Sequence, residues 1–243
     1  APQQPATPPI TAPQQPATPP ITAPQQPATP QTTALPEKTF TAPEHNHAKA
    51  EDADAQFDVA LKLEADGKIT EAINWYQRAA DQNQTAAQYN IGYAYFEGKG
   101  LPQSYVNAVN WFQKAVKQGL LDAQHMMGYL YEEGRGVEKK DNVKAIYWYR
   151  KAAKQGFADA QNYLGYIYEE GKITERNLSE AGMWFREAGN KRAIQCYREV
   201  AEKGDSDAQY MLGRIYGEGK IVERDPSKAA LWFMRAAENG DVD

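Results

Sequence analysis

Few side chains in this sequence could carry out catalysis or bind a metal ion. Catalysis needs a nucleophile with a base and an orienting group, or a cage of metal ligands. The 243 residues include three histidines, His45, His47 and His125, and one cysteine, Cys196. His45 and His47 could chelate a transition metal weakly, although a solvated linker explains them better. A lone cysteine forms neither an internal disulfide nor a C-x-x-C site, so we interpret Cys196 as a packed thiol. We therefore predict no catalytic residue, no cofactor site and no metal site.

Two pairs of acidic residues leave one catalytic alternative open. The pairs are Glu132 with Glu133 and Glu169 with Glu170. Carboxylates can act as general acid and base on a bound sugar, which is why Glu132 and Glu169 are kept as candidates for that role. We nevertheless interpret both pairs as the solvated end of a helix, and we predict that the protein is not an enzyme.

The charge and hydropathy of the chain exclude several classes of partner. The formal net charge of −5 argues against a nucleic-acid partner, because a phosphate backbone would be repelled. No basic patch of the membrane-binding type is present, and no stretch approaches the roughly 18 apolar residues of a membrane span. We therefore expect no direct membrane insertion. The sequence begins at Ala1 without a methionine, which favours removal of a leader by processing.

The first 50 residues differ in composition from the rest. An eleven-residue unit rich in proline, glutamine and threonine starts at Ala1, Ala12 and Ala23. Frequent proline and few large apolar side chains leave nothing to offset the entropy cost of ordering. We predict that residues 1–50 form a disordered, polyproline-II-rich linker. A ligand for proline-reading domains is the alternative.

Helical repeats follow this linker. One signature, Ala-x-x-Trp-(Tyr/Phe)-x-x-Ala, predicts a helix, here called helix B, whose alanines flank an indole in a slot between helices. Eight residues after the tryptophan, a glycine or asparagine is predicted to end the helix. The copies of this signature begin at Ala72, Ala108, Ala145, Ala181 and Ala229, and the capping residues are Asn83, Gly119, Gly156 and Gly240.

A second signature, Ala-Gln-x-x-(Ile/Met/Leu)-Gly-x-x-Tyr, predicts a companion helix A. A glycine in the middle of a helix costs about 1 kcal/mol, which is acceptable where it lets helix B cross at short distance. Later glycines mark the turn from helix A to helix B. The mid-helix glycines are Gly92, Gly128, Gly165 and Gly213, and they are spaced 36, 37 and 48 residues apart.

The period and both signatures resemble the Sel-one-like repeat family of the tetratricopeptide superfamily. The resemblance is carried by the Leu-Gly-x-x-Tyr core of helix A and by the segment from Lys144 to Ala153. It implies an all-α fold, a right-handed α-solenoid of antiparallel helix pairs, over residues 51–243. It also implies an adaptor that works in bacterial envelope assembly, signalling or host interaction, and hence a periplasmic or secreted location. Some cysteine-rich members of the family are linked to β-lactam binding, but their paired cysteines are missing here.

The long spacing marks an irregular insertion at about residues 182–204. It contains a second helix-B pattern that includes Ala193, Cys196 and Tyr197, and Gly189 with Asn190 reads as a stop followed by a new cap. Two helices in series and one longer helix kinked at Gly189 are both compatible with this pattern. In either case Cys196 takes the place of an indole.

The face of helix A that the core does not use is predicted to bind the partner. Helix A lines the concave side in this superfamily, so matching positions of successive repeats form a stripe along the groove. Tyrosine at these positions suits a protein or peptide surface. The alternative, that the rings only pack between repeats, stays open. The predicted partner-binding residues are Tyr89, Tyr93, Phe96, His125, Tyr129, Asn162, Tyr166, Tyr210 and Arg214.

These features lead to two functional hypotheses. The first is a scaffold that binds a partner protein or peptide in the concave groove of helix A. The second is an envelope enzyme or glycan-binding module acting on peptidoglycan or β-lactams, in which the aromatic stripe stacks on sugar rings. We favour the scaffold, because the sequence lacks a convincing catalytic constellation.

Overall fold

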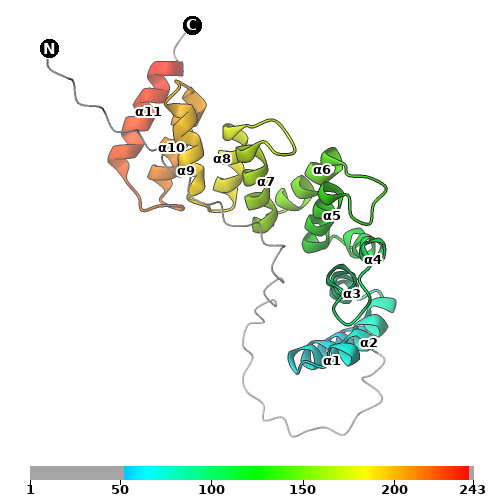
Figure 1. The fold of residues 1–243 in the computed structure, drawn as a ribbon. Coiled ribbons are helices and arrows are strands. Elements are labelled where there is room, and N and C mark those ends of the chain that lie inside the picture. Colours follow the sequence, from blue (N-terminus) through cyan, green and yellow to red (C-terminus); the bar gives the residue numbers. More distant parts are fainter. Residues whose placement is uncertain (1–51, 241–243) are drawn as a thin grey trace, which may run out of the picture. The chain divides into compact units, whose positions relative to one another are not determined.

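The computed structural model describes residues 52–240, and within that range the chain is all-helical, with no strand (Figure 1). The disorder predicted for residues 1–50 therefore lies outside the described residues. The eleven described helices are α1 (Ala53–Ala65), α2 (Ile69–Asp81), α3 (Thr85–Glu97), α4 (Tyr105–Lys117), α5 (Leu121–Glu133), α6 (Asn142–Ala153), α7 (Ala158–Glu170), α8 (Leu178–Glu187), α9 (Arg192–Ala201), α10 (Ser206–Glu218) and α11 (Pro226–Gly240).

Each helix packs against its neighbours in the sequence, which is the arrangement of an α-solenoid. The most extensive contacts are within the pairs α1/α2, α3/α4, α5/α6, α7/α8 and α10/α11, and smaller contacts join one pair to the next. In each pair the second helix carries the B signature. The first helix carries the A signature in α3, α5, α7 and α10, whereas α1 has Ala60 in place of the mid-helix glycine. The predicted fold class is therefore confirmed.

Local signals in the sequence set where these helices begin and end. Several B helices begin at a polar residue whose side chain accepts a backbone N–H, as Asp141 does from Lys144 at 3.0 Å. Helices α3, α5, α7 and α10 end at a glycine in the left-handed region, for example Gly134 with φ of 70°. The caps predicted after helix B are also confirmed, except that Gly240 is the last residue of α11.

The mid-helix glycines lie where helix B crosses helix A. A Cβ atom built at Gly128 would lie 2.6 Å from Cε1 of Tyr149, far inside van der Waals contact. Gly92, Gly165 and Gly213 face Phe112, Phe185 and Phe233 in the same way. The predicted close approach of the two helices is therefore confirmed.

The predicted position of the tryptophan is wrong in the first repeats. Tyr149 is fully buried against Gly128, whereas Trp148 is only half-buried and its ring lies under the Lys151 ammonium at 4.9 Å. Positions three and four residues after Ala145 lie almost on the same face of the helix, so the pattern alone does not separate them. The aromatic residue after the tryptophan takes the central place in these repeats. In α8 both Trp184 and Phe185 are buried, and in α11 Trp232 is buried while Phe233 is 37% exposed.

The irregular insertion consists of two separate helices, α8 and α9, divided at Gly189 with φ of 69°. The first of the two alternatives is therefore confirmed. A Cβ at Gly182 of α8 would lie 3.0 Å from the ring of Tyr197 in α9, which repeats the contact between Gly128 and Tyr149. Helix α8 therefore acts as helix B toward α7 and as helix A toward α9.

Candidate partner-binding surface

The residues predicted to bind a partner divide into buried and accessible groups. Tyr210 is exposed, with 49% of its surface accessible. The half-buried members are Tyr93, Tyr129, Asn162, Tyr166 and Arg214. Tyr89, Phe96 and His125 are buried, so the expectation that they face solvent is wrong.

Contacts from neighbouring helices explain why Tyr89 and Phe96 are buried. The ring of Tyr89 lies 5.5 Å from Phe112 of α4, the helix paired with its own. The ring of Phe96 packs edge-on against Tyr105 at 5.6 Å and against Tyr129 of the next A helix at 5.7 Å. Both rings are thus part of the packing within and between repeats.

Phe96 also links two half-buried tyrosines into one aromatic surface. Its ring centroid is 5.9 Å from that of Tyr93 on α3 and 5.7 Å from that of Tyr129 on α5. Burial raises the pKa of both tyrosines, and nearby Glu97 raises the pKa of Tyr93 further. Their hydroxyl groups therefore stay protonated at physiological pH.

Tyr166 on α7 has different neighbours because of the irregular insertion. Its ring packs edge-on against Phe185 at 5.0 Å, and the Arg192 guanidinium lies 5.2 Å above it. Arg192 Nε also donates to Glu169 Oε2 at 2.6 Å, and this hydrogen bond raises the pKa of Arg192. Glu169 is therefore held in an ion pair and is not a free acid.

His125 lies in a closed aromatic cage on α5. Its ring contacts Tyr149, Phe157 and Tyr163 at centroid distances of 5.2 to 5.8 Å. Its Nε2 atom is buried without a hydrogen-bond partner, and burial lowers the pKa of His125 to about 4. The imidazole is therefore neutral at physiological pH and belongs to the core.

Glu132 is a structural acceptor, a role that the sequence analysis missed. The Tyr149 and Tyr163 hydroxyls both donate to Glu132 Oε2 at 3.0 Å. Burial and the neighbouring Glu132 carboxylate raise the pKa of both tyrosines. Glu132 and Glu169 both make contacts between helices. These contacts do not favour a catalytic role for either carboxylate.

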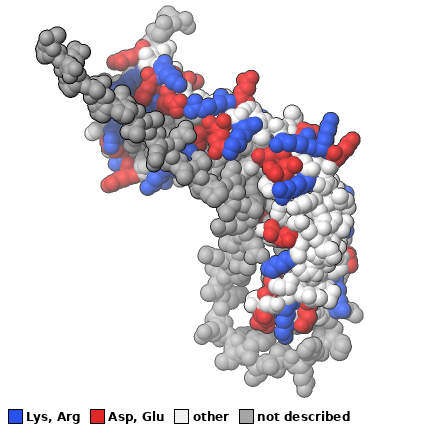
Figure 2. Space-filling model, viewed as in Figure 1, with Lys and Arg blue, Asp and Glu red and all other residues white. Residues whose placement is uncertain are grey.

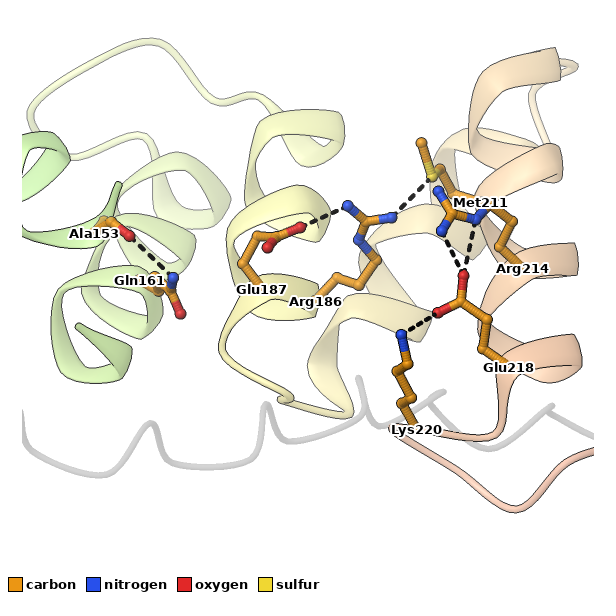
Figure 3. Close-up of polar contacts among 8 residues, drawn as sticks. All are labelled: Ala153, Gln161, Arg186, Glu187, Met211, Arg214, Glu218 and Lys220. Atoms are coloured by element: carbon orange, nitrogen blue, oxygen red, sulfur yellow. Dashed lines mark hydrogen bonds and ion pairs between the residues drawn. The ribbon is translucent and has the colours of Figure 1, made fainter. Parts of the chain in front are cut away.

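The glutamine of the Ala-Gln signature has a role that was also missed. Gln161 is buried on α7, and its Nε2 donates to the carbonyl oxygen of Ala153 on α6 at 3.0 Å (Figure 3). Gln209 makes the same bond to Ala201. Asn162 accepts a hydrogen bond from Asn190 at 2.8 Å, so this predicted site residue is already used within the chain. The signal that could have indicated this bridge is the recurrence of glutamine after alanine near the start of each A helix.

Residues 52–240 offer neither a metal site nor a membrane span. No three His, Cys, Asp or Glu side chains gather there in a way that could hold a metal ion. No helix in that range is long and apolar enough to span a bilayer.

Five segments of the chain match the Sel1 repeat model, at residues 53–84, 85–120, 121–157, 158–192 and 206–241. The chain therefore belongs to the Sel1 repeat family. The unmatched residues 193–205 hold most of α9, the helix that interrupts the regular alternation. Sel1 repeats are typically non-catalytic modules that act as scaffolds for protein–protein interaction.

Solved bacterial structures show the same fold. A protective antigen of uropathogenic Escherichia coli with an SLR fold is 32% identical, with a TM-score of 0.55, over 80% of this chain and 47% of that one. A Sel1 repeat protein from Oxalobacter formigenes is 33% identical, with a TM-score of 0.50, over 76% and 83% of the two chains. The chain thus spans about half the length of the Escherichia coli antigen. No curated protein matches the sequence.

Proposed function

We propose that this protein is a scaffold that binds a partner protein or peptide along the accessible face of its A helices. The observation that carries the proposal is the aromatic surface formed by Tyr93, Phe96 and Tyr129, which continues from one repeat to the next. Tyr166 extends the same helical position into a third repeat. Phe96 is buried beneath the two tyrosines and supports their rings.

The chemistry of this surface suits a polypeptide partner. Half-buried tyrosines offer rigid apolar area with a polar tip, at a low cost in side-chain entropy. On the face viewed in Figure 2, acidic and basic side chains are interspersed, and uncharged surface is widest around α3 to α5. Such a mixed surface is typical of protein recognition rather than of binding to a polyanion.

The bacterial setting is part of the same proposal. The Escherichia coli relative is described as a protective antigen, and both relatives are bacterial. We infer a periplasmic or secreted adaptor in a bacterial envelope or host-interaction setting, with residues 1–50 as its linker. The resemblance supports this setting by analogy.

The test begins with capture of the partner on the full chain, followed by its identification and titration. Tyr93→Ala, Tyr129→Ala and Tyr166→Ala should each weaken binding by about 5- to 30-fold, as for interfacial tyrosines in general. Tyr147→Ala is the matched control, because Tyr147 is 56% exposed on α6, which is a B helix and carries none of the three tyrosines tested. It should change the affinity by less than about twofold.

The fold of each variant is checked by circular dichroism. If Tyr93→Ala, Tyr129→Ala and Tyr166→Ala all left the affinity unchanged with the fold intact, the interface would lie elsewhere. A screen for hydrolysis of peptidoglycan and β-lactams tests the enzymatic alternative. Turnover that is lost in Glu132→Gln or Glu169→Gln would refute the scaffold as the main function.

A further inference from the structure

A cleft of about 330 Å³ opens between α8 and α10, where α9 interrupts the regular alternation. The side chains that line it come from the end of α8, from α10 and from the turn that follows α10. They include Arg186, Glu187, Arg214, Ile215, Glu218 and Lys220, and Gly189 and Ile221 complete the lining. Three of these side chains are cationic and two are anionic, so the cleft is net positive, in contrast to the net charge of −5 for the whole chain.

The double role of α8 explains the chemistry of this cleft. Arg186 follows Gly182 by four residues, as Glu132 follows Gly128, and both glycines pack against a tyrosine of the next helix. In the regular repeat, Glu132 accepts a hydrogen bond from Tyr163 of the next A helix. In the cleft, Arg186 takes the place of the carboxylate, and Met211, 48 residues after Tyr163, takes the place of the phenol.

This exchange leaves the Arg186 guanidinium poorly satisfied. Its Nη2 donates to Glu187 Oε1 at 2.6 Å, while Nη1 reaches only the weak acceptor Met211 Sδ at 3.5 Å. Its Nε is buried without a hydrogen-bond partner. A guanidinium has five N–H donors in a planar fork that matches a carboxylate, so Arg186 keeps capacity for an incoming anion.

The opposite wall holds a second guanidinium that an internal acid already occupies. Nε of Arg214 donates to Glu218 Oε1 at 2.9 Å, and Lys220 Nζ lies 3.3 Å from Glu218 Oε2. Figure 3 shows the guanidinium groups of Arg186 and Arg214 on the same side of α10, next to Met211. Glu218 thus already pairs with the Arg214 guanidinium, which an external carboxylate could share.

We propose that this cleft binds an acidic side chain of the partner polypeptide, whose carboxylate bridges Arg186 and Arg214. The inference rests on the proposed function, because Arg214 in α10 occupies the same helical position as Tyr166 in α7, directly after the mid-helix glycine. A peptide that contacts the tyrosines with apolar groups meets a cationic cleft where the repeat becomes irregular. Charge complementarity selects a carboxylate here, and the partner segment should carry Asp or Glu at that point.

The probe for this cleft is N-acetyl-triglutamate amide, titrated against the full chain. Binding is followed through the Nε–Hε resonances of the arginines. Three comparison ligands separate the possible sources of the anion: N-acetyl-triglutamine amide, inorganic phosphate, and N-acetyl-trialanine with a free terminal carboxylate. We expect saturable shifts with triglutamate, weaker binding of phosphate and trialanine, and none with triglutamine.

Substitutions then assign the site. Arg186→Gln and Arg214→Gln should each weaken triglutamate binding by about tenfold, because each removes one charge-assisted partner. Glu218→Gln should tighten binding several-fold, since it frees Arg214 and removes a repulsive charge. Arg224→Gln is the matched control, because Arg224 is exposed and does not line the cleft. It should leave the affinity within about twofold of the original.

Several results would overturn the proposal. They are equal binding of triglutamine, stronger binding of phosphate or of the terminal carboxylate, and binding that is insensitive to Arg214→Gln or weakened by Glu218→Gln. Arg214 and Glu218 are accessible, so these variants remain informative even if Arg186→Gln perturbs the fold. The tyrosine variants are scored on the captured partner, and failure of the triglutamate test would therefore leave the scaffold function standing.

Discussion

The contact between Gly128 and Tyr149 allows a sharp test of how the repeats are built. Tyr149 has no exposed surface, and its hydroxyl donates to Glu132 at 3.0 Å. In Gly128→Ala, the new methyl group would lie 2.6 Å from Cε1 of that ring. An ordinary carbon–carbon contact is about 3.5–4.0 Å, so the ring must move by about 1 Å.

The expected loss of stability follows from two opposing effects. Overpacking of a core costs about 1–3 kcal/mol, while replacing glycine by alanine inside a helix returns about 1 kcal/mol. Movement of the ring also strains its hydrogen bond to Glu132. We therefore expect Gly128→Ala to lower the free energy of unfolding by about 1–2 kcal/mol, or the Tm by about 2–8 °C.

Gly217→Ala is the matched control on another A helix. Gly217 lies in α10, where an added Cβ would have Ala229 Cβ at 3.7 Å as its nearest neighbour, an ordinary contact. The same substitution there should stabilise the chain, by up to about 1 kcal/mol. The two variants are therefore expected to change stability in opposite directions.

Urea unfolding followed by far-UV circular dichroism measures both variants. Hydrogen exchange adds local information, because a repeat array can open one repeat at a time. In Gly128→Ala the amides of α5 and α6 should exchange faster than those of α1 and α2.

A double-mutant cycle decides whether the ring is the cause. With Tyr149→Leu, the ring atoms that block the methyl group are absent, so Gly128→Ala should no longer destabilise the chain. If Gly128→Ala stabilised the chain as much as Gly217→Ala does, the reasoning on close helix approach would be refuted. Additive effects in the cycle would refute Tyr149 as the origin of the cost.

Three further predictions concern buried polar groups. Burial lowers the pKa of His125 to about 4, so protonation of this imidazole favours the unfolded chain. The free energy of unfolding should keep its full value above pH 6.5 and decrease toward pH 4, with a loss of about 2 kcal/mol at pH 5. This pH dependence should flatten in His125→Phe. Burial, aided by nearby Glu169, raises the pKa of Cys196 to about 12, so a thiol reagent should react at least about 100-fold more slowly with the folded chain than in urea; equal rates would contradict a packed thiol. Tyr149→Phe removes a donor to Glu132 and should cost about 1–3 kcal/mol in urea unfolding, whereas Tyr147→Phe on the same helix should cost less than about 0.5 kcal/mol.

Much of the fold could be predicted because its signals are local. A left-handed cap such as Gly134 depends on the backbone of one residue, and glycine adopts that conformation at little cost. The mid-helix position of Gly128 likewise indicates a close helix crossing from the sequence alone. The repeat multiplies such signals, so each copy supports the assignment of the others.

The candidate site was predicted less well, because burial depends on what the next helix brings. Tyr89, Phe96 and His125 occupy positions that a single amphipathic helix would show to solvent, and rings from adjacent helices cover them. The sequence analysis placed Trp148 rather than Tyr149 in the slot between helices, and this was wrong for a related reason: with 3.6 residues per turn, both positions flank the same face.

By itself the sequence determined the helical repeat, its period, its caps and its breakpoint near Gly189, since these follow from residue types at fixed spacings. Only the tertiary structure decided that α8 serves two neighbours at once. That double packing places Arg186 where the regular repeat has Glu132, and so brings it beside α10 and Arg214. Side chains from helices far apart in the sequence form such a cleft together, and no local pattern encodes their meeting.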